Sequence, residues 1–215
     1  MSLQTGPVTP IVGGLLLLNI GIYVLLPQAM SWEIYQQFAL WPLAGGLTGV
    51  WPDWAGRFAV WQLVTYGFLH GGFFHLFFNM FALWMFGSVL EQVWGASRFL
   101  FFFLFCVVGA GLVQLFVATQ ALGSGSLYPT VGASGGVFGV LLAFAMLFPN
   151  QQLRLLIPPV AIKAKYLVIL YGAFTLYAGV SGSLGGVAHF AHLGGMVFGF
   201  FLVQYWRGGF PFNRR

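Results

Sequence analysis

Six apolar segments dominate this sequence and limit what it can fold into. They cover residues 9–27, 72–93, 98–118, 133–148, 166–180 and 187–206. About 20 apolar residues in a helix cross the hydrocarbon core of a bilayer, and most of these segments approach that length. A transmembrane β-barrel would instead show strands of about ten residues with alternating polarity. The pattern therefore predicts an all-α, polytopic membrane protein with six transmembrane helices.

The scarcity of charge leads to the same class of protein. Hydrophobic residues make up 60% of the chain and charged residues 5%, with eight basic and three acidic side chains in total. A soluble domain carries about 25% charged residues. The composition therefore excludes a soluble enzyme and a disordered regulator. The net charge of +5 is small and scattered, so it does not indicate nucleic-acid binding. The single cysteine, Cys106, cannot form an internal disulfide and is interpreted as a packing residue.

The chain is expected to form one membrane domain over residues 1–215, without a cleavable signal peptide. Residues 28–69, between the first two segments, differ from the rest because they carry Glu33, Asp53 and Arg57. They are also rich in tryptophan, which favours the membrane–water interface. These residues are Trp32, Trp41, Trp51, Trp54 and Trp61. We expect a long structured first loop that lies partly in the interface.

The distribution of basic residues predicts the topology. Only Arg57 falls in the first loop, whereas seven basic residues fall in loops that six spans would place on the opposite side. These are Arg98, Arg154, Lys163, Lys165, Arg207, Arg214 and Arg215. Because basic loops stay in the cytoplasm, both termini are expected there. A bacterial inner (plasma) membrane is the expected location.

Three polar clusters open the second, fourth and sixth apolar segments. The first holds His70, His75 and Asn79, the second Ser134, and the third His189 and His192. With a cytoplasmic N-terminus, all three clusters lie in the outer part of the bilayer. Polar and ionisable groups at such positions are costly and usually functional. Their common depth therefore predicts one site, in a polar cavity open to the outer side.

The spacing of small residues predicts how this site assembles. Gly135 and Gly139 give the fourth segment a thin face, and Gly195 and Gly199 give one to the sixth. Helices with such faces can approach closely. We expect this packing to bring a serine and a histidine of the two segments within about 2.6–3.2 Å, as a nucleophile and its base require.

The chemistry that follows is acyl transfer by a Ser–His dyad. A neutral imidazole can accept the proton of the Ser134 hydroxyl, and the amide of Ser134 lies at a helix start, where it has no intrahelical partner. Asn79 and His75 share a helix face at i,i+4 and can add donors for an oxyanion. None of the three acidic residues is placed to complete a triad. His189 is a second candidate base, although only His192 heads the stripe that Gly195 and Gly199 continue.

Other site chemistries fit less well. A zinc protease of the His-Glu-x-x-His type is excluded because no histidine is followed by glutamate. An aspartyl dyad is excluded because Asp53 is the only aspartate. The four histidines are not accompanied by cysteine or acid in the outer layer, so neither a metal nor another cofactor is expected.

These residues resemble the rhomboid family of intramembrane serine proteases, over about residues 11–206. The motifs are His-x-x-x-x-His-x-x-x-Asn from His70 to Asn79, Gly-x-Ser-Gly around Ser134, and Ala-His-x-x-Gly-x-x-x-Gly around His192. The resemblance implies Ser134 as nucleophile and His192 as general base. It also implies an oxyanion hole of His75, Asn79 and the Ser134 amide, with His70 in the cavity. Glu91 matches a structural acidic residue of the family.

Two positions depart from the family pattern. Trp61 is followed by Gln62, where the family often has arginine. Phe138 stands where several members have a tyrosine that stacks on the catalytic histidine, so a ring remains but its hydroxyl is missing.

The expected partners are transmembrane segments of other proteins, as substrates, and membrane lipids. Such a helix must unwind locally to expose a peptide bond. The first loop, the fifth segment and the loop after it are candidate gates. The alternatives are an inactive rhomboid-like protein that binds transmembrane segments, and a small transporter. A transporter would show charged residues at the midplane, which the segments lack. The sequence does not indicate an oligomeric state.

Overall fold

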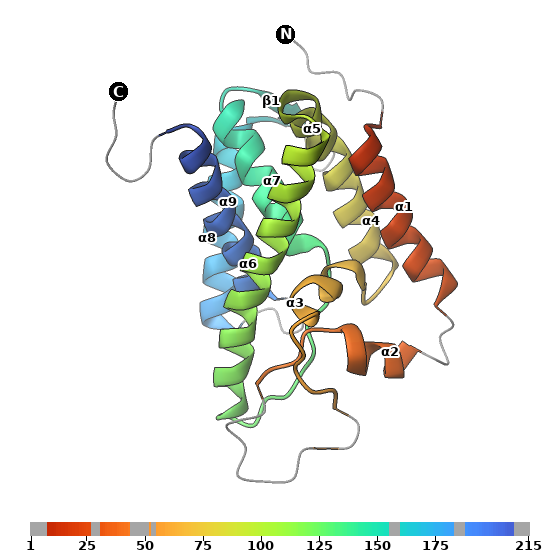
Figure 1. Cartoon of the computed structure of the whole chain (residues 1–215). Helices are drawn as coiled ribbons and strands as arrows, with labels where there is room; N and C mark the ends of the chain where they lie inside the picture. Colours follow the sequence, from red (N-terminus) through yellow and green to blue (C-terminus); the bar gives the residue numbers. More distant parts are fainter. Residues whose placement is uncertain are drawn as a thin grey trace.

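The computed structural model describes residues 8–26, 31–43, 52, 55–154, 160–182 and 188–208. Helices form nearly all of its regular structure (Figure 1). Several residues used above lie outside the described residues: Trp51, Asp53, Trp54, Arg214 and Arg215, and most of the loop after the fifth segment. Within the described part, a helix or a continuous helical run occupies each of the six apolar segments.

The six helical runs end within a few residues of the bounds expected from sequence. They are α1 (Pro10–Leu25), the run of α4 (Phe73–Ala82), η4 (Leu83–Gly87) and α5 (Ser88–Trp94), then α6 (Ala96–Leu122), α7 (Ser134–Leu147), α8 (Ala164–Ser181) and α9 (His189–Trp206). The second run contains a π-helical turn, η4, and α6 is longer than expected. Three runs are long and apolar enough to cross a membrane on their own: Phe73–Trp94, Ala96–Leu122 and Ala164–Ser181. The count of six spans stays a prediction.

The first loop is built from short helices and contains one clear correction. Its elements are α2 (Ser31–Phe38), α3 (Gln62–Thr65) and the 3₁₀ turn η3 (Tyr66–Phe68). Trp41 was expected at the membrane interface, but it is fully buried. Its indole nitrogen donates to the carbonyl of Tyr35 at 2.9 Å, and its amide donates to the buried side chain of Gln62 at 3.2 Å. A loop aromatic can be internal because the loop folds on itself.

Gln62 has a structural role at the position where the family often has arginine. Its side-chain nitrogen donates to the carbonyl oxygens of Gln37 at 3.2 Å and Arg57 at 2.9 Å. The side chain is only 1% exposed, so it does not face lipid. Gln62 therefore ties three parts of the first loop together.

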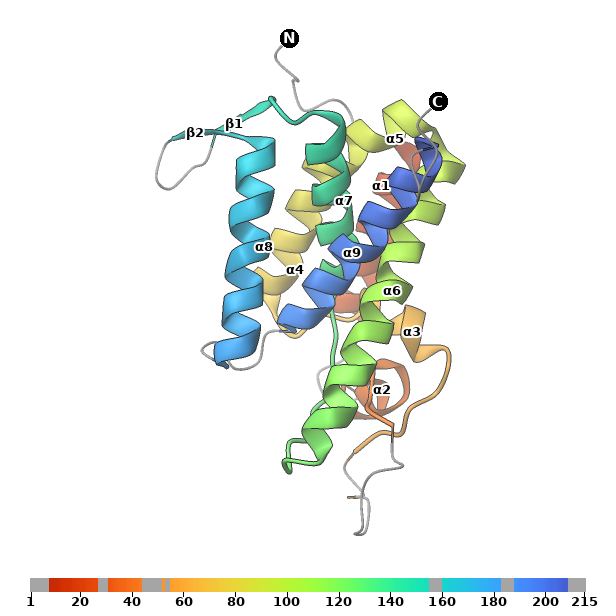
Figure 2. The same cartoon turned by 90° about the vertical axis from the view of Figure 1, so that its left-hand side faces the viewer.

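The central helix of the bundle is α7. It contacts α6, α8 and α9, and the α4–α5 run lies on its other side (Figures 1 and 2). Its first six residues are all buried, from Ser134 to Gly139. The strands β1 (Gln152–Arg154) and β2 (Ala161–Lys163) pair antiparallel and connect α7 to α8 at one end of the molecule (Figure 2). A helix in this position is surrounded by protein on most sides. It can therefore be shorter than a helix that must span the bilayer in contact with lipid.

The contact between α7 and α9 is made by backbone atoms. A Cβ added at Gly195 would lie 1.9 Å from the carbonyl oxygen of Gly135, and one added at Gly139 would lie 3.0 Å from that of Gly195. A Cβ at Gly199 would lie 3.2 Å from the Cα of Gly139. Larger side chains at these positions would push the helices apart. The four glycines therefore fix the separation of α7 and α9.

The N-terminus of α1 is held by one carboxyl group. Glu91, on α5 and 4% exposed, accepts hydrogen bonds from the Thr9 hydroxyl and from the amides of Ile11 at 3.0 Å and Val12 at 2.9 Å. An acidic group at a helix N-terminus satisfies free amides and interacts favourably with the helix dipole. Glu91 therefore attaches α1 to the rest of the bundle.

Candidate active site

Ser134 and His192 meet at the starts of two helices. Ser134 is the first residue of α7, and His192 lies in the first turn of α9. The distance between Ser134 Oγ and His192 Nε2 is 2.9 Å, which is a hydrogen bond. The glycine contact described above brings the two helices close enough for this bond. The pair has the geometry that a nucleophile and its general base need.

An aromatic ring fixes the orientation of the imidazole. Phe138 follows Ser134 by one turn of α7, and its ring stacks on that of His192 with a centroid distance of 4.1 Å and an angle of 6°. Tyr171 of α8 packs on Phe138 at 5.4 Å. The ring is thus held between two helices. A phenylalanine can provide this contact without the tyrosine hydroxyl that some family members have.

His75 lies against the turn that precedes Ser134. Gly132 has a φ of +128°, which side chains rarely adopt. A Cβ there would lie 2.6 Å from His75 Cε1 and 3.7 Å from Ser134 Oγ. Only glycine fits at this position, both for its conformation and for its space. The His75 ring therefore borders the serine, and it is the exposed member of the group.

Asn79 offers a free donor at the same face of α4. It lies one turn after His75 and is 6% exposed. Its Nδ2 has no hydrogen-bond partner among the described residues. A buried amide without a partner usually costs free energy, and such groups concentrate at functional sites. The Ser134 amide, at the start of α7, is a further donor that the helix itself does not use.

His70 lies next to His75 in the candidate site. Its ring lies 5.1 Å from that of His75, and its carbonyl oxygen accepts a hydrogen bond of 2.9 Å from the Tyr35 hydroxyl. Burial raises the pKa of the Tyr35 phenol, with a smaller contribution from Tyr23. The hydroxyl therefore stays protonated and donates. Through this bond the first loop is attached to the site.

Sequence reasoning missed Tyr66. Its carbonyl oxygen accepts from the amide of Gly132 at 2.9 Å, and its hydroxyl donates to the carbonyl of Val107 at 2.7 Å. Tyr66 thus connects the turn before Ser134 to the centre of α6. No pattern along the chain identifies this residue, because its partners are 41 and 66 positions away and an aromatic residue in the first loop is ordinary.

The second candidate base is placed differently. His189 is the first residue of α9 and is 5% exposed. Its ring lies 6.3 Å from that of His192, nearly perpendicular to it. The hydrogen bond to Ser134 Oγ is made by His192. The geometry therefore favours His192 as the base.

Two further features could serve a site of this kind, a metal ion and a carboxyl group that would complete a triad. Among the described residues, no group of three histidine, cysteine or acidic side chains could hold a metal ion. Glu91 is bonded to the start of α1, and Glu33 lies on α2. His192 Nδ1 has no hydrogen-bond partner within the described chain, so no carboxyl group from that part completes a triad. The arrangement is a Ser–His pair with adjacent donors.

The fold and the site together define a mostly helical integral membrane protein with a paired serine and histidine among apolar helices. The rhomboid domain family matches residues 57–208 of the chain. The chain belongs to the rhomboid family, as the motifs predicted.

Named relatives of the chain include proteases. Over 138 residues it is 34% identical to Rhomboid protein 1, mitochondrial, of Saccharomyces cerevisiae. The aligned region covers 64% of this chain and 39% of that protein. It is 32% identical over 142 residues to the rhomboid protease GluP of Bacillus subtilis, which covers 66% of this chain and 25% of that protein. The rhomboid protease GlpG of Photorhabdus laumondii is 26% identical over 218 residues, covering 100% of this chain and 67% of that protein. The chain thus spans well under half the length of the first two relatives.

Proposed function

We propose that this protein is an intramembrane serine endopeptidase that cleaves peptide bonds in or near transmembrane segments of other proteins. The observation that carries the proposal is the 2.9 Å hydrogen bond between Ser134 Oγ and His192 Nε2, with Phe138 stacked on the imidazole. Membership of a family with named proteases supports it.

The reaction takes two acyl-transfer steps. Ser134 Oγ attacks the carbonyl carbon of the peptide bond while His192 accepts the hydroxyl proton, and the same imidazole then protonates the departing amine. A water molecule next attacks the acyl-enzyme, and His192 again takes and returns a proton. The Ser134 amide, Asn79 and His75 donate to the oxyanion that forms in both steps.

The substrate and water must reach a serine that is largely buried, although the neighbouring His75 is exposed. Ser134 is 9% exposed, and His70 and Asn79 are each 6% exposed. Access therefore requires movement of the elements around it, for which the first loop and α8 are the candidates. Fewer of the α8 residues are buried than in α6 or α7, so α8 should be displaced more easily than either of those helices.

The proposed arrangement in the membrane has six spans, with both termini in the cytoplasm of a bacterial cell and the site open to the outer side. The described basic residues support this topology. Arg98, Arg154, Lys163, Lys165 and Arg207 all lie at the end of the bundle where α1 begins and α9 ends. Fusion of a reporter enzyme to each loop tests the topology directly. A basic loop found on the outer side would overturn it.

The dyad is tested with a fluorophosphonate probe on the purified full chain, together with cleavage of a generic transmembrane substrate. We expect labelling and cleavage in the wild type, and loss of at least about 10³-fold in cleavage for Ser134→Ala and for His192→Ala. Ser124→Ala, which changes an exposed serine outside the site, is the matched control and should be unaffected.

Two results would change the conclusion. If His189→Ala abolished cleavage while His192→Ala retained it, the assignment of the base would be wrong. If the folded wild type neither labelled nor cleaved, the protein would be a rhomboid-like binder of transmembrane segments.

A further inference from the structure

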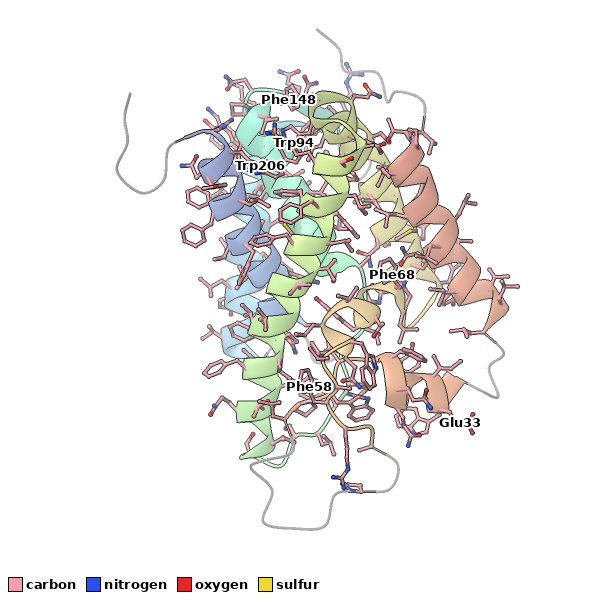
Figure 3. The ribbon with its side chains drawn as sticks, viewed as in Figure 1. Glu33, Phe58, Phe68, Trp94, Phe148 and Trp206 are labelled. Atoms are coloured by element: carbon pink, nitrogen blue, oxygen red, sulfur yellow. The ribbon has the colours of Figure 1, made fainter. Side chains whose placement is uncertain are left out.

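A small cavity lies far from the dyad, where the ends of four helices meet. Its volume is about 150 Å³, and it is lined by Trp94, Arg98, Leu147, Val203, Trp206 and Arg207. These residues come from the end of α5, the start of α6, and the ends of α7 and α9. Figure 3 shows Trp94 and Trp206 close together at this end of the bundle.

Two guanidinium groups line this cavity. The Arg98 guanidinium carbon lies 5.0 Å from the ring centroid of Trp206, which is a cation–π contact. Arg207 donates one hydrogen bond, of 2.8 Å, to the carbonyl oxygen of Met146 at the end of α7. A guanidinium has five N–H donors, so both groups keep most of theirs free. Both side chains are exposed, and no carboxyl group of the described chain bonds to either.

The chain has few acids that could neutralise these cations. Of its three acidic residues, Glu91 is occupied by the start of α1. Glu33 lies on α2 at the opposite end of the molecule, as Figure 3 shows. The third acidic residue, Asp53, lies outside the described residues. No carboxyl group of the described residues therefore forms an ion pair with either guanidinium of the cavity, because the Glu91 oxygens are bonded to the start of α1.

The start of α6 adds to the positive potential. Arg98 is the third residue of this 27-residue helix, and the N-cap, Gly95, provides no side-chain hydrogen bond to the first amides. The free amides and the dipole of a helix N-terminus favour an anion. The two arginines thus favour a negatively charged ligand, and the dipole of α6 adds to the positive potential beside Arg98.

The remaining walls are apolar and aromatic. Val203 is buried and Leu147 is half-buried, and the rings of Trp94 and Trp206 meet edge to face at 5.3 Å. Tryptophan favours the level of lipid headgroups, and arginine binds phosphate through paired hydrogen bonds. A ligand with a phosphate joined to an apolar body fits this combination better than a free ion does.

We infer that this cavity binds the headgroup of an anionic phospholipid, with Arg98 and Arg207 on the phosphate oxygens and the glycerol region over Leu147 and Val203. The site lies at the basic end of the bundle, where an anionic leaflet attracts basic side chains. The inference does not depend on proteolysis, and Ser134→Ala protein can be used to test it.

Native mass spectrometry of the full chain, released from detergent, measures the binding. The probes are phosphatidylglycerol and phosphatidylcholine with identical acyl chains, and inorganic phosphate as a competitor. We expect at least fivefold greater retention of phosphatidylglycerol. The double variant Arg98→Gln/Arg207→Gln should lose at least fivefold of that retention. The matched control, Arg154→Gln/Lys163→Gln, removes the same charge at the same end outside the cavity and should lose less than twofold.

Several outcomes would overturn the inference. An equal loss in both double variants would show a diffuse electrostatic effect instead of a site. Displacement of the lipid by millimolar inorganic phosphate would show a site for the free ion. If the glutamine variant does not fold, Arg98→Lys/Arg207→Lys keeps the charge but loses the planar guanidinium. Unchanged retention in that variant would exclude the proposed paired hydrogen bonds.

Discussion

Two buried polar residues on the same helical run, Asn79 on α4 and Glu91 on α5, differ in how their side chains are hydrogen-bonded. Glu91 accepts three hydrogen bonds, from a hydroxyl and two amides at the start of α1. Asn79 Nδ2 has no partner among the described residues. Glu91 contributes to holding the bundle together, whereas Asn79 keeps a hydrogen-bond donor available. The comparison separates a residue that stabilises the fold from one whose bonding capacity is left for a ligand.

Removing the carboxyl group at Glu91 should have the largest effect on stability. Glu91→Ala leaves a hydroxyl and two amides without their acceptor, so we expect a loss of about 3–5 kcal/mol in the free energy of unfolding. The measurement is unfolding in mixed micelles. Gln92→Ala, at the exposed neighbouring position, is the control. A loss of less than about 1 kcal/mol would mean that α1 is held mainly by apolar packing.

At Asn79 we expect the opposite result, which is a loss of activity with little change in stability. Asn79→Ala removes the proposed oxyanion donor and should lower kcat/KM by about 10²–10³-fold. Stability should change little, because the lost nitrogen has no partner within the described protein. Ser88→Ala serves as the control, since its buried Oγ also lacks a partner in the described chain. If both variants cleaved equally well, an unpartnered donor would not mark the site.

The glycine contact should affect stability and activity together. In Gly195→Ala the new Cβ would meet the carbonyl of Gly135, so α7 and α9 must separate. Overpacking of this kind costs about 1–3 kcal/mol. We also expect the hydrogen bond between Ser134 and His192 to lengthen and cleavage to fall. Gly14→Ala, where a Cβ meets nothing within 4 Å, is the control. Full activity in Gly195→Ala would show that the dyad does not depend on this contact.

The smallest effect is expected at the stacked ring. Phe138→Leu keeps an apolar contact but loses the stacking on His192, which is worth about 0.5–1.5 kcal/mol. We therefore expect a reduction of about tenfold or less in kcat, while Phe138→Tyr should cleave within about threefold of wild type. Single-turnover kinetics separates this effect from substrate binding. A loss as great as that of His192→Ala would assign the ring a larger role than orientation.

The sequence predicted those features of the fold that depend on local patterns. The apolar segments located the six helical runs to within a few residues, because each helix is built from a continuous stretch. The approach of α7 to α9 followed from glycines at i,i+4 on both segments. Glu91 was interpreted as structural, and the hydrogen bonds at the start of α1 agree with that role.

Contacts between distant parts of the chain could not be predicted. Tyr66 connects the turn at Gly132 to Val107, and nothing near Tyr66 in sequence indicates this. Trp41 is of a residue type that favours the membrane interface, yet the folded loop buries it. Arg98 and Arg207 line one cavity although they are separated by most of the helical core. In each case the partner is set by the tertiary fold and not by the local pattern.

The backbone contact between α7 and α9 has a consequence for how this protein can vary. The separation of the two helices, and with it the Ser134–His192 distance, is set by glycine backbones that no side chain can replace. Positions such as Phe200 and Phe201, on the exposed side of α9, take no part in that contact. We therefore expect that these outer positions can change with the composition of the bilayer while Ser134 Oγ and His192 Nε2 keep their spacing.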